Sequence, residues 1–298
     1  MKKLLIFFIL IFALLLNSGC STIKTDTNTD DIKITTTIFP YYDFIRSLTG
    51  YDSQVSMLLP LGAESHTYEP TPHDILEIAD SDLFIYTGGK SDSWIDDIIN
   101  SISDTDVKLL KLTDVFDPAD SEHTYDEHIW TSPKNSIKIV NEIYTSLSEI
   151  DPENSENYKS NRDEYINRLT SLDDELTNVV SNAKRKTLVF ADRFPFTHLA
   201  NDYGLHCISA FSGCAEETEP SMKTISNIIK KVKDENIPTV FYIEFSNQKL
   251  ADTIVRETGV NTALMHSCHN ISKEEFENGI TYIDLMHRNI NEIKEALN

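Results

Sequence analysis

Apolar positions along the chain repeat in two ways, and together they predict strands and helices in alternation. Short runs rich in β-branched and aromatic residues are typical of strands, whereas apolar residues three and four positions apart are typical of helices. In the first part of the chain, strands are expected at residues 32–39, 55–59 and 83–86, and helices at 42–48, 73–79 and 94–102. Alternation at this spacing predicts a parallel sheet covered by helices.

The middle of the chain has a helical pattern. Ser132 and Pro133 form a typical helix start, because serine caps the first turn and proline fits its first position. After Asp151-Pro152, a second pattern runs over residues 155–183 without glycine or proline. About 28 residues at a rise of about 1.5 Å each would make a rod of about 42 Å, which suits a brace between two lobes. Two helices with a break near Ser171 are the alternative.

Strand and helix patterns alternate again after residue 186. Strands are expected at 187–191, 206–210, 239–243 and 262–265, and helices at 196–202, 224–235, 248–258 and 280–297. The predicted fold is therefore α/β, with two lobes that each contain a mostly parallel sheet flanked by helices. We expect the N-terminal lobe at residues 32–153, one long connecting helix at 154–185 and the C-terminal lobe at 186–298.

The first residues follow the pattern of a secretion signal. A basic start precedes an apolar run from Leu4 to Leu16, which is shorter than the roughly 20 residues of a membrane-spanning helix. The stretch that ends in Cys20 resembles a bacterial lipoprotein signal, in which that cysteine is lipidated, although Asn17 stands where leucine is usual. We expect a signal peptide at residues 1–19 and a flexible tether at 20–31. A plain secretory signal is the alternative.

Charge narrows the choice of partners. The chain has 48 Asp and Glu residues against 26 Lys and Arg residues, a formal net charge of −22. So acidic a surface repels phosphate backbones, which argues against nucleic-acid binding, and it raises the local concentration of cations. Apolar residues make up 40% of the chain, as in a globular protein.

Side chains that bind metals occur at the expected ends of strands. His66 follows the second strand, and His128 comes just before the helical middle of the chain. Asp192 and His266 directly follow two strands of the C-terminal half. Because ligands in open parallel sheets bind beyond the carboxyl ends of the strands, these four side chains are candidates for one metal site between the lobes.

Several motifs resemble those of the zinc/manganese solute-binding proteins of bacterial metal ABC transporters. The stretch 62–72, which contains His66, resembles the first metal-ligand motif of that family. The stretch 126–133 with the later Asp151-Pro152 resembles the second, and 190–194 with 203–205 resembles the third. Residues 279–289 resemble the closing helix of the family. The resemblance runs through the whole mature chain in order.

The resemblance implies a ligand set of His66, His128, Asp192 and His266. Asp192 stands where the family has His or Glu, and His266 stands where it usually has Asp. Three nitrogens and one oxygen suit a tetrahedral Zn²⁺ site, whereas Mn²⁺ prefers more oxygen ligands. Mn²⁺ remains the alternative, because Asp192 could bind through both oxygens and Glu69 or Glu216 could approach.

Other residues near the expected site have open roles. His269 could replace His266 or join it. Cys214 and Cys268 could form a disulfide outside the cytoplasm, and thiolate binding to the metal is the rival interpretation. Glu244 follows the strand at 239–243 and is a candidate for orienting a histidine ligand.

The predicted function is that of a receptor, not an enzyme. The resemblance implies a monomeric lipoprotein on the outer face of the bacterial cell membrane, which binds Zn²⁺ or Mn²⁺ between its lobes and passes the ion to an ABC permease. A zinc hydrolase is the rival from another class, but the sequence contains no His-Glu-x-x-His motif and four protein ligands would leave no open position. A surface adhesin is a third possibility.

Overall fold

Parallel sheets form the framework of both lobes. The protein is described here by a computed structural model that covers residues 32–50, 54–116, 126–211 and 220–298, and within these residues it contains two four-stranded sheets. The first sheet contains β1 (Lys33–Thr36), β2 (Gln54–Met57), β3 (Leu83–Tyr86) and β4 (Lys108–Lys111). The second contains β5 (Thr187–Phe190), β6 (His206–Ser209), β7 (Thr239–Tyr242) and β8 (Asn261–Leu264). Every pairing is parallel.

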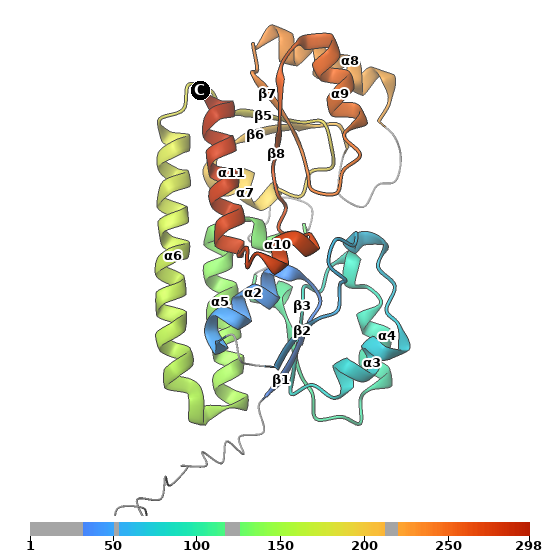
Figure 1. Cartoon of the computed structure of the whole chain (residues 1–298), viewed down its shortest axis with the longest axis vertical. Coiled ribbons are helices and arrows are strands. Elements are labelled where there is room, and N and C mark those ends of the chain that lie inside the picture. The colour runs from blue at the N-terminus through green and yellow to red at the C-terminus, as the bar shows by residue number, and fades with distance from the viewer. Residues whose placement is uncertain (1–31, 51–53, 117–125, 212–219) are drawn as a thin grey trace, which may run out of the picture. The chain divides into compact units, whose positions relative to one another are not determined.

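Helices connect and cover the strands, as Figure 1 shows. Their bounds are α2 (Phe39–Thr49), α3 (Pro72–Ala79), α4 (Ile95–Ser101), α5 (Pro133–Ile150), α6 (Ser155–Ser181), α7 (Thr197–Tyr203), α8 (Met222–Asp234), α9 (Lys249–Thr258), α10 (Lys273–Glu277) and α11 (Tyr282–Leu297). The long helix α6 lies beside α5 and α11 along one side of both sheets (Figure 1). None of the helices in the described part of the chain combines the length and apolar character needed to cross a membrane.

The order of the strands determines where ligands can bind. The two sheets have the same topology, β2-β1-β3-β4 and β6-β5-β7-β8. In each sheet the chain first adds a strand on one side of the starting strand and then crosses to the other side. The crevice at such a switch point, beyond the carboxyl ends of the central strands, is the usual binding place in open α/β sheets.

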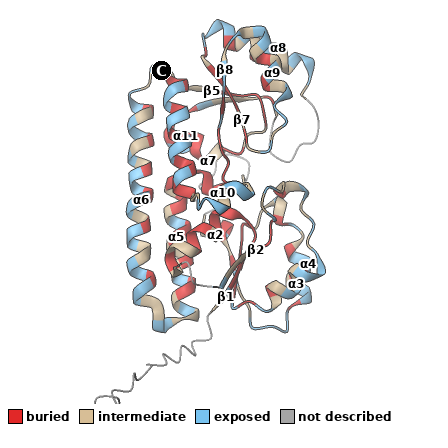
Figure 2. Cartoon of the chain, in the orientation of Figure 1, coloured by how far each residue is buried: buried red, intermediate tan, exposed pale blue. Residues whose placement is uncertain are grey.

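One hydrophobic core joins the two lobes. Its buried residues come from α2, α5, α6 and α11 and from the strands of both sheets, and Trp130 and Tyr282 are among its largest side chains. Two smaller clusters lie under α3 and α4 in the first lobe and under α8 and α9 in the second. Buried residues follow the strands and the inner faces of the helices in Figure 2, while the outer face of α6 is exposed. Residues 32–298 therefore form a single compact unit.

Most of the expected elements are present, but the first strand, β4 and the short helix α10 differ from the expectation. The α/β fold with two parallel sheets and one long helix is confirmed, and α6 is continuous through Ser171, so the two-helix alternative is wrong. The expected first strand is too long, because Phe39 already begins α2. Strand β4 was not predicted, since its sequence Lys-Leu-Leu-Lys carries lysines at both ends and forms the edge of the sheet. The expected signal peptide, Cys20 and the tether lie outside the described residues.

Candidate metal centre

Three histidines from three separate segments come together between the lobes. His66 lies in a turn of 3-10 helix at Ser65–Thr67 after β2, and His128 directly precedes the 3-10 turn Ile129–Thr131 that leads into α5. His269 lies in the segment between β8 and α10. The ring centroids are 5.6 Å apart for His66 and His128, 5.3 Å for His66 and His269, and 5.5 Å for His128 and His269. One nitrogen of each ring lies within 4.8 Å of the others, a spacing at which one ion can contact all three.

Oxygen atoms hold the Nδ1 atom of each of these rings. The pairs are His66 with Ser91 Oγ at 2.7 Å, His128 with Asp126 Oδ1 at 2.7 Å, and His269 with Ser65 Oγ at 3.0 Å. The Asp126 carboxylate can only accept, and the Ser91 hydroxyl donates its own proton to Glu127, so each accepts the Nδ1 proton of its ring and leaves a lone pair on Nε2. The Ser65 hydroxyl can accept from His269 in the same way. This arrangement of an oxygen, an imidazole and a metal is the usual support of histidine ligands in proteins.

Glu127 extends the support of His66. Its carboxylate accepts a hydrogen bond from the Ser91 backbone N–H at 2.9 Å and another from the Ser91 hydroxyl at 2.5 Å. It also lies 3.7 Å from Nδ1 of His66. The chain can approach so closely only because position 89 is glycine, since a Cβ there would lie 2.4 Å from Cβ of Glu127.

Asp126 supports His128 in the same way. Its carboxylate accepts from the backbone N–H of His128 at 2.9 Å as well as facing the ring. Burial raises the pKa of Asp126, but the hydrogen bonds and the charge of His128 outweigh burial and lower that pKa to about 2. Helix α7 of the second lobe reaches the same residue, because Nε2 of His198 lies 2.8 Å from the Asp126 carbonyl oxygen.

The surroundings favour the neutral form of His269 and His66. Burial lowers the pKa of His269 well below its ordinary value, and the neighbouring His128 and His66 rings add to this effect. Burial and the nearby His128 also lower the pKa of His66. Because a metal binds the neutral ring, protons compete less for this centre than for an exposed group of histidines.

His266 lies outside this group and is bonded differently. The backbone N–H of Cys268 donates to Nδ1 of His266 at 2.9 Å, so Nδ1 carries a lone pair and the proton of the neutral ring sits on Nε2. That Nε2 is buried and has no hydrogen-bond partner among the described groups. Asn289 accepts from the backbone N–H of His266 at 2.7 Å and so anchors this residue to α11.

Asp192 also lies outside the group of three imidazoles. Its carboxylate accepts from the backbone N–H of Arg193 at 2.8 Å and from that of Ile243 at 3.3 Å. These contacts join the segments that follow β5 and β7. The sequence placed Asp192 correctly at a strand end, but here its carboxylate organises the backbone at the switch point of the second sheet.

The other candidate residues from the sequence also lie outside the three-histidine group or outside the described residues. Glu244 accepts from the Ser267 backbone N–H at 2.8 Å and from the Ser267 hydroxyl, and it lies 3.8 Å from Nδ1 of His266. Glu69 is exposed and is not part of the three-histidine group. Cys268 is a buried thiol, whereas its expected partner Cys214 and the acidic Glu216 lie outside the described residues. The disulfide therefore stays a prediction.

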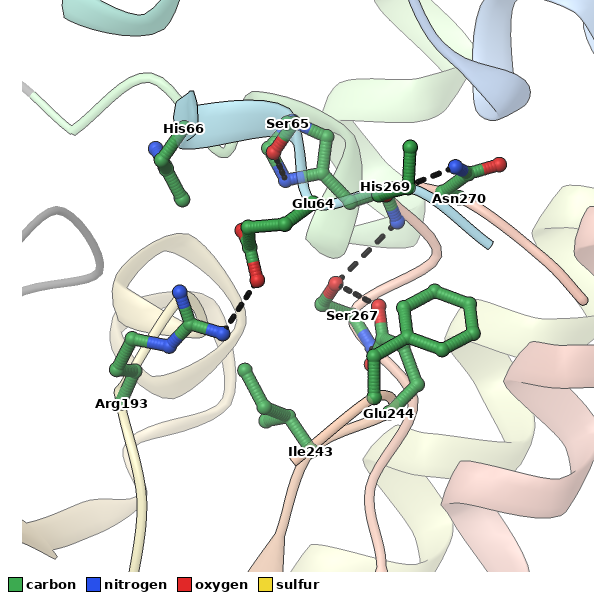
Figure 3. A pocket seen from close by; sticks show the side chains of 11 residues that line it. Glu64, Ser65, His66, Arg193, Ile243, Glu244, Ser267, His269 and Asn270 are labelled. Atoms are coloured by element: carbon green, nitrogen blue, oxygen red, sulfur yellow. Dashed lines mark hydrogen bonds and ion pairs between the residues drawn. The ribbon is translucent and has the colours of Figure 1, made fainter. Parts of the chain in front are cut away.

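A small cavity adjoins the histidines, as Figure 3 shows. It has a volume of about 20 Å³, and His66, His269 and Ser267 are among the residues that line it. Glu64 and Arg193 lie on its other side, with Glu64 Oε2 at 2.6 Å from Arg193 Nη2 (Figure 3). This ion pair joins the segment after β2 in the first lobe to the segment after β5 in the second.

Comparison with known proteins identifies the family. Residues 34–296 match the sequence profile of the family described as zinc-uptake complex component A, periplasmic. The chain belongs to this family. The family resemblance expected from the sequence is thus confirmed.

Relatives in the zinc-uptake component A family differ in length. The zinc-binding protein AdcA of Streptococcus pyogenes is 32% identical over 287 residues, which cover 88% of this chain and 55% of AdcA. The high-affinity zinc uptake system protein ZnuA of Bacillus subtilis is 29% identical over 309 residues, which cover 97% of this chain and 96% of ZnuA. The chain therefore spans about half the length of AdcA and nearly all of ZnuA.

Solved structures of family members share the fold. The metal-dependent lipoprotein YcdH from Bacillus subtilis superposes with a TM-score of 0.79 at 30% identity, over 90% of this chain and 100% of that chain. The Zn(II)-bound ZnuA-like domain of AdcA from Streptococcus pneumoniae gives a TM-score of 0.77 at 30% identity, over 90% of this chain and 99% of that domain.

Sequence reasoning missed the residues that support the histidines in this member of the zinc-uptake component A family. Ser65 and Asp126 stand one and two positions from a predicted ligand, which is a local signal. Ser91 could be found only from its place after Gly88-Gly89, where β3 ends. Nothing in the sequence connects Ser91 with Glu127, because 36 positions separate them.

Proposed function

We propose that this protein is an extracytoplasmic receptor that captures a divalent transition metal and delivers it to the membrane permease of an ABC transporter. The observation that carries the proposal is the convergence of three buried imidazoles whose Nδ1 atoms face oxygens. The names of two relatives point the same way, since one is called a zinc-binding protein and the other a component of a zinc uptake system.

The ligands in this proposal are His66, His128 and His269, each through Nε2. Three imidazoles leave one position of a tetrahedral Zn²⁺ site for a further ligand. Asp192 and His266 remain candidates for that position. To bind the ion, Asp192 would have to give up backbone hydrogen bonds. His266 would have to break the hydrogen bond from the Cys268 N–H to Nδ1, or move its ring proton from Nε2 to Nδ1.

Zn²⁺ is the proposed cargo and Mn²⁺ the alternative. Imidazole nitrogens suit Zn²⁺, whereas Mn²⁺ favours carboxylate, carbonyl and water oxygens and six ligands. The three-histidine group is rich in nitrogen, and the carboxylates Asp126 and Glu127 lie behind the rings, beside Nδ1, where they support the ligands. This donor set favours zinc.

A receptor role fits the cavity better than hydrolysis does. Three histidines with an open fourth position also occur in catalytic zinc sites, which need room for water and substrate. The cavity at His66 and His269 has a volume of about 20 Å³, enough for one water molecule and too small for a peptide or an ester. We therefore assign binding and release of the ion, and no catalysis, to this centre.

In this proposal the N-terminal residues anchor the receptor to the membrane. A lipid on Cys20 would hold a monomeric receptor at the outer face of the cell membrane, and the Asp- and Thr-rich residues up to 31 would act as a tether. A single acyl chain gives only weak membrane binding, so stable attachment requires the multiple chains of a bacterial lipoprotein or a further contact with the permease.

Metal analysis tests the function. Purified mature protein is incubated with equimolar Zn²⁺ and Mn²⁺, passed through a desalting column and analysed by elemental mass spectrometry. We expect one zinc per chain, almost none in His66→Ala and His128→Ala, and the full amount in the control His287→Ala, whose ring pairs with Glu175 on the surface. Full zinc content in His66→Ala and His128→Ala would refute the proposed centre, and manganese in place of zinc would select the alternative cargo.

A further inference from the structure

The three imidazoles are enclosed, so an ion needs a path to reach them. Only 7% of the His66 side chain and 6% of the His128 side chain are exposed, and His269 is 9% exposed. A receptor must nevertheless load and unload its cargo. Some part of the enclosure must therefore open, and its contacts determine which part opens most easily.

One wall of the enclosure is held by many hydrogen bonds. Residues 267–271, which include His269, belong to the second lobe in sequence but are bonded to the first lobe. The bonds are Phe39 N–H to His269 O at 3.2 Å, Gly62 N–H to Ile271 O at 2.9 Å, Asn270 Nδ2 to Pro60 O at 2.7 Å and to Ala63 O at 2.9 Å, and Trp130 Nε1 to Ser267 O at 2.9 Å. Opening this wall would break five hydrogen bonds at once, which is costly.

The Glu64–Arg193 ion pair lies on the opposite side of the cavity, as Figure 3 shows. Glu64 and Arg193 line the same cavity as His66 and His269, and their ion pair spans from one lobe to the other. The Glu64 side chain is 33% exposed and the Arg193 side chain 22%, several times more than the histidine rings. One ion pair with partial solvent contact costs less to open than the several hydrogen bonds of the other wall.

We propose that Glu64 and Arg193 form a gate, which must open for a metal ion to pass between solvent and the three histidines. This inference rests on the proposed function and adds to it how the ion is exchanged. When the pair is closed, the Arg193 guanidinium stands across the cavity, where its positive charge opposes the passage of a cation.

The test separates a gate from a ligand by comparing rates with affinity. The double variant Glu64→Gln/Arg193→Met removes the pair without changing the net charge. Zn²⁺ dissociation from the loaded mature protein is followed by stopped flow with an excess of a chromogenic chelator, and association is followed with Zn²⁺ alone. We expect both rates to rise by about fivefold, the order expected for losing one such pair, while Kd stays nearly constant. The control Lys108→Met/Glu149→Gln removes an ion pair that lies outside the cavity and should leave both rates unchanged.

Two results would overturn the gate. Dissociation as slow as in the unchanged protein would mean that the pair does not limit exchange. A faster dissociation with unchanged association, and hence a weaker Kd, would make Glu64 a ligand or a structural group instead. Should the double variant unfold, Glu64→Gln alone breaks the same pair, and an unchanged dissociation rate in it likewise overturns the gate. Failure of the unchanged protein to bind Zn²⁺ would refute the proposed function and is thus a distinct outcome.

Discussion

The Ser65 hydroxyl lies 3.0 Å from Nδ1 of His269, although 204 positions separate the two residues in sequence. Ser65 belongs to the segment that carries His66, so one lobe both supplies a histidine and orients the histidine of the other lobe. The two lobes therefore build the centre jointly. A change at the interface of the lobes should affect metal binding even where it touches no ligand.

The first prediction distinguishes His269 from His266. We expect His269→Ala to weaken Zn²⁺ binding by about 100-fold or more, because it removes a ligand and not merely the support of one. His266→Ala should weaken binding less than His269→Ala does, since His266 could bind the ion only after its ring gives up the bond with the Cys268 N–H or rearranges. Competition with a chelator of known affinity measures both. A larger loss in His266→Ala than in His269→Ala would contradict the ligand set.

The second prediction concerns the close approach of Gly89 and Glu127. Gly89→Ala places a methyl group 2.0 Å from the Oε2 position of Glu127, while the backbone at Gly89, with φ of −96°, suits alanine. We expect a loss of about 1–3 kcal/mol in the free energy of unfolding, measured in urea, because the site is overpacked. Zn²⁺ affinity should fall by about 10-fold to 100-fold, since the displaced Glu127 no longer holds Ser91 beside His66.

A compensating change provides the control for Gly89. In Gly89→Ala/Glu127→Gly the clashing atoms of Glu127, its Cβ included, are absent, so much of the lost stability should return. The affinity for Zn²⁺ should stay low, because the carboxylate that holds Ser91 is missing. Recovery of the affinity together with the stability would show that Glu127 plays no part in positioning His66.

The third prediction uses the neutral state of His269. Burial and the neighbouring imidazoles hold the pKa of His269 well below the ordinary value of 6.5. In the unfolded chain this ring takes up a proton as the pH falls through 6.5, whereas in the folded metal-free protein it stays neutral. Its contribution to stability is therefore present above pH 6.5 and is lost as the pH falls below it.

Urea unfolding of the metal-free protein at pH 7.5 and 5.5 measures this loss. Between pH 7.5 and 5.5 the free energy of unfolding should fall by about 1 kcal/mol more in the unchanged protein than in His269→Gln, which has no ring to protonate. A direct check is the NMR titration of His269, whose ring signals should not shift over the same range. Equal losses in the two proteins would contradict the lowered pKa.

The fourth prediction has the opposite sign and concerns Asp43. Its carboxylate accepts from the Tyr165 hydroxyl at 3.1 Å and from the Tyr282 backbone N–H at 3.0 Å, which ties α2 to α6 and α11. Burial raises the pKa of Asp43 to about 6 from 3.8, and the two hydrogen bonds offset only part of that effect. The folded state thus binds a proton more tightly than the unfolded state, and this contribution to stability is lost as the pH rises from about 4 through 6.

Asp43→Asn keeps the shape and an acceptor oxygen but cannot ionise. Relative to this variant, the free energy of unfolding of the unchanged protein in urea should fall by about 1 kcal/mol from pH 5 to 7.5. The matched control is Asp163→Asn on the exposed face of α6. Its free energy of unfolding should change with pH as that of the unchanged protein does. If the free energy of unfolding of Asp43→Asn also changes with pH as that of the unchanged protein does, the raised pKa of Asp43 is contradicted.

Local patterns were sufficient for most of the fold because they reflect short-range physics. Strands such as β3, in which Leu83 to Tyr86 are all buried, appear as continuous apolar runs, and the uninterrupted helical period of residues 155–181 predicts one long helix. Strand β4 could not be predicted from the sequence pattern, because it has only two apolar residues between two lysines. Its place follows from pairing with β3, which is a long-range contact.

The order of residues was enough to predict the fold class, the alternation of strands and helices, the family, and the segments that carry His66 and His128. Which side chain of the segment after β8 joins them depended on how the two lobes pack. His266 and His269 stand three positions apart, so local sequence brings both near the same point. What separates them is the group that faces Nδ1, a backbone N–H for His266 and the Ser65 hydroxyl for His269. A backbone donor directs the ring proton of His266 to Nε2, whereas a hydroxyl can accept the Nδ1 proton of His269 and leave a lone pair on Nε2. The Ser65 contact forms only when the two lobes pack together.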